Sequence, residues 1–368
     1  MAGNRAASRT HSNPEARRDQ LVILGSIVVL AVVAVIVLIG LFLTVYKPPR
    51  ERILTIGSKQ WDASAVERRA LYMLQYQQAI APKSPTEIAT KTLDTLEREE
   101  ALRQKAKDLV PEVTSDDVTK ELQGQLAPPA PPSPTIDPSS GLQATVTIGT
   151  ATPAAGASPT ATPTVDQSKY TKALQDRLTK SKLTKAELDG VIMAGLYEDR
   201  LSAKFKNELP KTAAQVNVAV ARTSDEALAN QIRSIVSRPN VDFSQVASQN
   251  SVSAATGGLK AGAPLWVTLD ELDGPTKDAV QKLKAGEVSP VVKVGDYFEV
   301  YKAIEVSADR EITDASKDAL ANKKILDWLN KAVADLKPQR TMDKTREDWI
   351  NTHTVTDFTK AVATPSAK

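Results

Sequence analysis

Residues 284–306 read KAGEVSPVVKVGDYFEVYKAIEV. The first four, Lys284–Glu287, place a glycine among charged residues and predict a turn. From Val288 to Val306, two apolar runs joined at Gly295–Asp296 predict two β-strands. This segment is therefore predicted to form the last part of a β-sheet.

The residues before this segment alternate between short strands and helices. A half-buried strand is predicted where valines alternate with smaller or polar residues, at Val216, Val218 and Val220. Helices are predicted at Asp225–Ser237, around Phe243–Ala247 and at Thr276–Leu283, with a turn at Gly257–Gly258. Together, residues 214–306 make an α+β unit of about ninety residues, which is close to the usual domain size.

The order strand, helix, helix, Gly-Gly, helix, GEVS and strand resembles the parvulin family, the PpiC-type rotamase domain. The stretches that carry the resemblance are TSDEALANQIRSIV, VDFSQVASQNSVSAATGGL, KDAVQKLKAGEVSPVV and GDYFEVYKAIEV. The resemblance implies a small antiparallel sheet wrapped by helices, and it implies peptidyl-prolyl isomerase activity without a cofactor.

The resemblance also implies a pocket with a histidine on the first strand and another on the last. Matching the positions puts Val218 and Phe298 where these two histidines belong, so both are absent. Ser251 falls at or near the cysteine or aspartate position and is the candidate catalytic residue. Leu272 takes the apolar methionine position and Thr276 the phenylalanine position, so the expected pocket is Val218, Leu272, Thr276 and Phe298.

Prolyl isomerisation breaks no covalent bond, and its barrier of roughly 18–20 kcal/mol is lowered by holding a twisted amide in an apolar, polar-flanked pocket. We therefore expect a pocket without histidines to bind proline segments and to catalyse weakly or not at all. Cysteine is absent and the two histidines are His11 and His353, which excludes thiol chemistry, a zinc–cysteine site and a histidine triad. No metal is expected.

Upstream, residues 51–213 are predicted to be mainly helical. Ser84–Glu87 combines a capping serine, a proline at the first helical position and a glutamate that reaches back. The stretch LEREEALRQKAKDLVPEVTSDDV resembles the N-terminal chaperone domain of SurA-, PrsA- and PpiD-type foldases. The short apolar run Ile53–Gly57 is open between a strand and a linker.

An insert rich in proline, threonine and alanine, residues 127–166, interrupts this helical region. It has few charges and few large apolar side chains, so we expect it to be disordered. A spacer is the favoured role, with a proline-motif ligand or a glycosylated stalk as alternatives. Residues 307–368 are expected to form a helix near Lys323–Leu336 and a tail that frays after Lys360.

An apolar run, Leu21–Tyr46, carries no charge between Asp19 and Lys47 and is long enough to cross a bilayer. It exceeds the h-region of a signal peptide and lacks a small-x-small cleavage site after it, which favours a retained single-pass anchor. The flanking basic residues balance, so the orientation follows from the resemblance: residues 1–20 in the cytoplasm and the bulk of the chain outside.

The 47 basic and 44 acidic residues give no one-signed field, so no nucleic-acid partner is expected. The leading hypothesis is a membrane-anchored extracytoplasmic chaperone or foldase that binds unfolded or proline-containing exported polypeptides. One alternative is an active prolyl isomerase with a rearranged pocket. Another is a non-catalytic scaffold of a membrane complex such as the secretion machinery.

Overall fold

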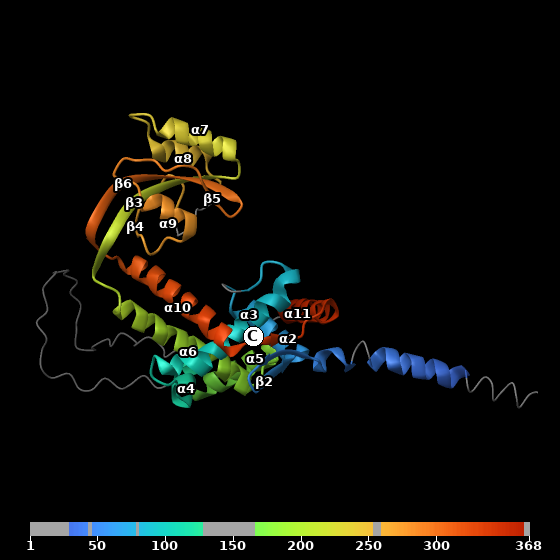
Figure 1. Ribbon diagram of the computed structural model, residues 1–368. Coiled ribbons are helices and arrows are strands. Elements are labelled where there is room, and N and C mark those ends of the chain that lie inside the picture. The colour runs from blue at the N-terminus through green and yellow to red at the C-terminus, as the bar shows by residue number, and fades with distance from the viewer. Residues whose placement is uncertain (1–28, 43–45, 79–80, 128–165, 253–258, 364–368) are drawn as a thin grey trace, which may run out of the picture. The chain divides into compact units, whose positions relative to one another are not determined.

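The computed structural model describes residues 29–42, 46–78, 81–127, 166–252 and 259–363 (Figure 1). Their contacts divide the chain into two units. Unit 1 comprises Met1–Glu97, Lys172–Lys185 and Lys337–Lys368. Unit 2 comprises Arg98–Thr171 and Ala186–Leu336. The boundary therefore does not follow the order of the chain, because unit 1 is built from segments of both halves.

Unit 1 contains a three-stranded antiparallel sheet in the order β2-β1-β7. Strand β1 (Arg52–Ile56) turns at Gly57, whose φ is +58°, into β2 (Lys59–Asp62). On its other side β1 pairs with β7 (Gln339–Arg340). The run that the sequence left open between strand and linker is therefore the central strand of this sheet.

Along the chain, helices precede and follow the strands of this sheet. Unit 1 has the 3-10 helices η2 (Pro48–Arg50) and η3 (Pro85–Glu87), together with α2 (Ala63–Tyr76), most of α5 (Gln167–Ser181) and α11 (Lys344–Ala363). The Asp62 carboxylate caps α2 by accepting from the Ala65 N–H at 2.8 Å. Ser84 caps η3, which leads into α3 (Ile88–Lys105), so the predicted helix start at Ser84 is confirmed.

The C-terminal segment differs from its prediction. The helix expected near Lys323–Leu336 is the second half of α10 (Asp314–Leu336). Between this helix and Lys360, where no element is predicted from the sequence, lie β7 and most of a further helix, α11. Buried Ile350 and Thr354 anchor α11 in unit 1. These residues were missed because α11 carries few large apolar side chains.

Unit 2 begins with helices on both sides of the insert. After η4 (Ala106–Asp108), α4 (Ser115–Leu126) starts with a capping box between Thr114 and Asp117. Arg200 on α6 (Lys185–Asn207) donates to Asp117 at 2.9 Å, so the helices before and after the insert contact each other. The insert itself lies outside the described residues, except for its two end positions.

The second sheet is antiparallel in the order β4-β3-β6-β5. Its strands are β3 (Thr212–Thr223), β4 (Leu265–Thr268), β5 (Val292–Val294) and β6 (Tyr297–Glu311). One face packs against α7 (Glu226–Val236) and α8 (Phe243–Asn250), and the other faces α9 (Gly274–Val280), as Figure 1 shows. The predicted α+β fold, a small antiparallel sheet wrapped by helices, is confirmed.

Within the part of the chain that the structure describes, no helix is both long enough and apolar enough to cross a membrane. The predicted span Leu21–Tyr46 lies partly outside that part, at residues 21–28 and 43–45. Of the remainder, residues 29–41 are helical, and their large apolar side chains are exposed.

Candidate functional site

Three of the expected pocket residues meet on the face of the sheet that α9 covers. Val218 on β3 and Leu272 before α9 belong to one core cluster, which also contains Tyr301 of β6. Thr276 on α9 joins them because its hydroxyl lies 2.9 Å from the Tyr301 hydroxyl. All four side chains are at most 2% exposed. The position of the predicted pocket is therefore filled by its own side chains.

Phe298 lies on the opposite face of the same sheet. It pairs with Thr223 across the strands and packs against the cluster that α7 and α8 cover. Successive side chains of a strand point to opposite faces, so Phe298 cannot share a face with Glu299 or Tyr301, its neighbours at odd spacing. The structure thus separates Phe298 from Val218, Leu272 and Thr276.

Ser251 ends α8 and is half-buried. Its hydroxyl oxygen accepts a hydrogen bond from the Arg222 N–H at 3.0 Å, and the next N–H, of Val252, donates to the Arg222 carbonyl at 2.8 Å. These two bonds fasten the end of α8 to β3. The hydroxyl proposed as catalytic therefore has a structural partner, and the Gly257–Gly258 turn beyond it lies outside the described residues.

A buried polar cluster occupies the β6 side of the predicted pocket. The Tyr301 hydroxyl donates to the fully buried Glu299 carboxylate and also contacts the Thr276 hydroxyl. The Arg222 guanidinium lies 3.4 Å from Glu299 and stacks over the Tyr297 ring at 3.9 Å. Burial, reinforced by the hydrogen bond to Glu299, raises the pKa of Tyr301 well above its usual value.

This cluster fixes what the site can do chemically. A tyrosine with a raised pKa stays a neutral phenol, which can donate one hydrogen bond but does not act as a base near neutral pH. That hydrogen is already given to Glu299. Sequence reasoning missed the cluster, although a single acidic residue inside the apolar run of β6, Glu299, is the one sign of it in the sequence.

Comparisons with known proteins agree with this part of the fold. Residues 209–305 match the Rotamase family, described as the PPIC-type PPIASE domain. The foldase protein PrsA of Lactococcus lactis subsp. cremoris is 34% identical over 132 residues, which are 36% of this chain and 42% of that protein. The matched region therefore spans less than half the length of this relative.

Solved structures of the same kind align over most of the chain. The peptidylprolyl isomerase PrsA from Bacillus anthracis is 15% identical, with 75% of this chain and 99% of that chain covered and a TM-score of 0.36. The foldase protein PrsA from Lactococcus lactis is 12% identical, with 84% and 92% covered and a TM-score of 0.26.

Proposed function

We propose, from the premise that residues 209–305 are a parvulin-type PPIase domain and that the chain is related to PrsA foldases, that this protein is a chaperone or foldase for unfolded polypeptides. Its parvulin-type domain binds proline-containing segments and has weak or no isomerase activity. The observation that carries the proposal is that Val218 stands where the family has its first-strand histidine. This valine lies inside a closed cluster with Leu272, Thr276 and Tyr301.

The physical reason lies in what isomerisation requires. The twisted amide of the transition state needs room between an apolar floor and polar groups that are free to bind it. Here the available phenol and hydroxyl groups bind each other and Glu299, and their side chains are at most 2% exposed. Opening the cluster would remove the hydrogen bond from Tyr301 to Glu299 Oε2 and leave this buried carboxylate with Arg222 alone, which is costly in a buried site.

We also propose that the protein is anchored in a membrane. We place the chain on the outer side of a bilayer, held by a single-pass anchor over Leu21–Tyr46. The support is the uncharged run itself, which contains enough residues to cross about 30 Å of hydrocarbon as a helix. Unfolded exported polypeptides are the proposed clients. The alternative to a chaperone is a non-catalytic scaffold of a membrane complex such as the secretion machinery.

The test uses the full chain in detergent micelles. We expect it to suppress aggregation of an unfolded client at near-equal molar ratio while leaving the isomerisation rate of a proline peptide unchanged. Ser251→Ala should change neither result, because the hydroxyl acts on the Arg222 backbone; it should cost only about 1 kcal/mol of stability. Ser248→Ala, at an exposed position of the same helix, is the matched control.

A measurable rate enhancement that is lost in Tyr301→Phe, with the fold intact by circular dichroism, would establish an active enzyme with a rearranged pocket. Loss of that rate in Ser251→Ala instead would restore the serine as the catalytic residue. Crosslinking to one stoichiometric membrane protein, without suppression of aggregation, would favour the scaffold.

A further inference from the structure

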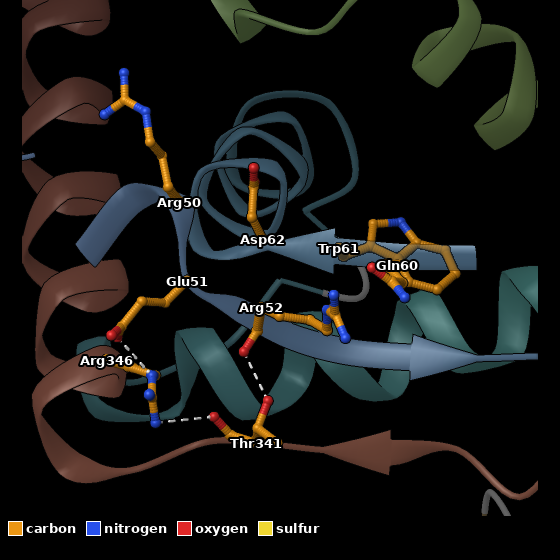
Figure 2. Close-up of a pocket in the computed structure, with 8 residues that line it drawn as sticks. All are labelled: Arg50, Glu51, Arg52, Gln60, Trp61, Asp62, Thr341 and Arg346. Carbon is orange, nitrogen blue, oxygen red and sulfur yellow. Dashed lines mark hydrogen bonds and ion pairs between the residues drawn. The ribbon is translucent and has the colours of Figure 1, made fainter. Parts of the chain in front are cut away.

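Unit 1 contains an open cavity of about 700 Å³. Its walls come from the segment that follows the apolar run and from Thr341 and the first turn of α11, two segments nearly 300 residues apart in the chain (Figure 2). The lining residues are polar, charged or aromatic: Arg50, Glu51, Arg52, Gln60, Trp61, Asp62, Thr341 and Arg346. Three arginines thus face two carboxylates.

Both carboxylates already have partners. Glu51 binds the Arg346 guanidinium at 2.7 Å and Lys47 at 3.3 Å, and the hydrogen bond from Arg346 lowers the pKa of Glu51. Asp62 accepts from the Ala65 N–H as the cap of α2. A ligand entering the cavity therefore meets one carboxylate paired with cations, Glu51, and one held by neutral donors, Asp62. Arg50 and Arg52 outnumber Asp62, so the charge that remains is positive.

That positive charge is concentrated on Arg50 and Arg52. The Arg52 side chain is exposed, and the described part of the chain holds no hydrogen-bond or ion-pair partner for its guanidinium. Figure 2 shows it extending along the strands toward Gln60 and Trp61. A guanidinium with its donors unused matches the oxygens of a phosphate group in two-point geometry.

Arg50 connects the cavity to the apolar segment. Its guanidinium lies 3.9 Å from the centre of the Tyr46 ring and donates to the Tyr46 carbonyl at 2.9 Å. The Tyr46 ring in turn stacks on Phe42 at 5.3 Å, and the Lys47 N–H donates to the Phe42 carbonyl at 2.8 Å. The stacked groups change from apolar to charged along the chain, from the Phe42 ring through the Tyr46 ring to the Arg50 guanidinium. Tyrosine and arginine are typical of the lipid headgroup layer.

We propose that this cavity binds the phosphate of an anionic phospholipid headgroup in the bilayer that holds the preceding apolar segment. The inference rests on the anchoring proposed above. The volume fits a headgroup-sized ligand, since small-molecule sites range from about 300 to 1,000 Å³. Binding there would fix unit 1 against the membrane surface. A free phosphate has the same chemistry, so the experiment must separate the two sources.

The test is a lipid titration of the full chain in detergent, followed by native mass spectrometry. Short-chain phosphatidylglycerol should bind more tightly than phosphatidylcholine, by about five-fold per arginine and about thirty-fold in total. The preference should disappear in the double variant Arg50→Gln, Arg52→Gln. Both side chains are on the surface, so the fold should be kept. The double variant Arg238→Gln, Lys282→Gln, which removes two exposed cations of unit 2, is the charge-matched control.

Three results bear on the proposal separately. Equal affinity for the two lipids, or a preference that survives in the double variant, would overturn it. Competition by inorganic phosphate at a concentration similar to that of the lipid would assign the cavity to free phosphate and overturn the lipid source. Extraction of the full chain from membranes by alkaline carbonate tests the anchor alone, so a failed anchor with an intact lipid preference would leave the cavity as a peripheral headgroup site.

Discussion

Gly262 lies close to the backbone of α8, at Ser244. Its φ is +72°, its N–H donates to the Val220 carbonyl at 2.9 Å, and a Cβ there would lie 2.4 Å from the Ser244 carbonyl oxygen. Both the backbone conformation and the missing side chain are therefore required, because the obstacle is backbone and cannot rotate away.

We predict that Gly262→Ala destabilises unit 2 by on the order of 3 kcal/mol, from the left-handed backbone and the clash together. Thermal or urea unfolding of the full chain measures it. Gly286→Ala separates the two causes, since Gly286 has a φ of +85° but nothing within 4 Å of its Cβ position. Equal losses in both variants would mean that the close approach to Ser244 contributes nothing.

The alternation of side chains between the two faces of a strand explains why the candidate site was only partly predictable from the sequence. The first-strand position, Val218, and the apolar positions Leu272 and Thr276 were placed by the order of elements and do meet in the structure. Phe298 was placed by counting along β6, where an error of one residue moves a side chain to the other face. The side chain of β6 that does lie with Val218, Leu272 and Thr276 is Tyr301, three residues after Phe298.

Among the helices and strands, α2 and α11 carry a pair of carboxyl groups that share one lysine. Glu67 of α2 is buried, and the Lys182 ammonium lies 4.0 Å from it and also binds Asp357 of α11. Burial raises the pKa of Glu67 from 4.5 to about 7, against the attraction of Lys182. Although partial burial opposes it, the hydrogen bond from Lys182 lowers the pKa of Asp357.

We predict a pH dependence of unit 1 from this arrangement. A carboxyl whose pKa is raised on folding stabilises the folded state most below its unfolded pKa, and this contribution is lost as the pH rises through about 7. Asp357, with a lowered pKa, stays ionised across that range and adds no slope. Glu67→Gln should therefore flatten the fall in stability from about pH 5 to about pH 8, by on the order of 1–3 kcal/mol.

Thermal unfolding of the full chain across that pH range, with hydrogen exchange to identify unit 1, provides the measurement. The matched control is Glu87→Gln, which removes an exposed carboxyl from the same unit and should leave the slope as it is. A slope that persists unchanged in Glu67→Gln would show that other groups cause it.

The elements with strong local patterns were predictable, and those that depend on distant partners were not. β3 has alternating valines and α7 has apolar residues at helical spacing, and both elements were predicted from the sequence. β7 is two residues long, and its pairing with β1 fixes it, not its own sequence. Nothing local in Gln339–Arg340 indicates a strand.

The C-terminal segment of the chain, residues 337–368, completes unit 1. Arg340 binds Glu97 at 2.6 Å and Asp94 at 2.8 Å, and Asn351 accepts from the Ala89 N–H at 2.9 Å. The Thr341 N–H donates to the Ile53 carbonyl at 2.8 Å. Deleting residues 337–368 would remove these bonds together and leave both edges of a two-stranded sheet open.

We predict that this deletion unfolds unit 1 and leaves the parvulin-type domain folded, because a two-stranded sheet has only marginal stability. Limited proteolysis of the chain that lacks residues 337–368 should cut within residues 52–97 and spare residues 209–305. A chain ending at Ala363 keeps β7 and α11 and serves as the control. Protection of residues 52–97 in the deletion variant would contradict the prediction.

The hydrogen bond between Thr341 and Arg52 joins residues 289 positions apart, so it cannot form until almost the whole chain has been synthesised. At about 5–20 residues per second, the ribosome delivers the last strand of unit 1 roughly 15–60 s after the first. The continuous segment that forms the second sheet ends at Glu311, so it is complete before this last strand at Gln339–Arg340. The nascent chain thus carries a finished parvulin-type domain beside an apolar β1 that still lacks its neighbour, so this protein itself passes through the kind of unfinished state that chaperones recognise.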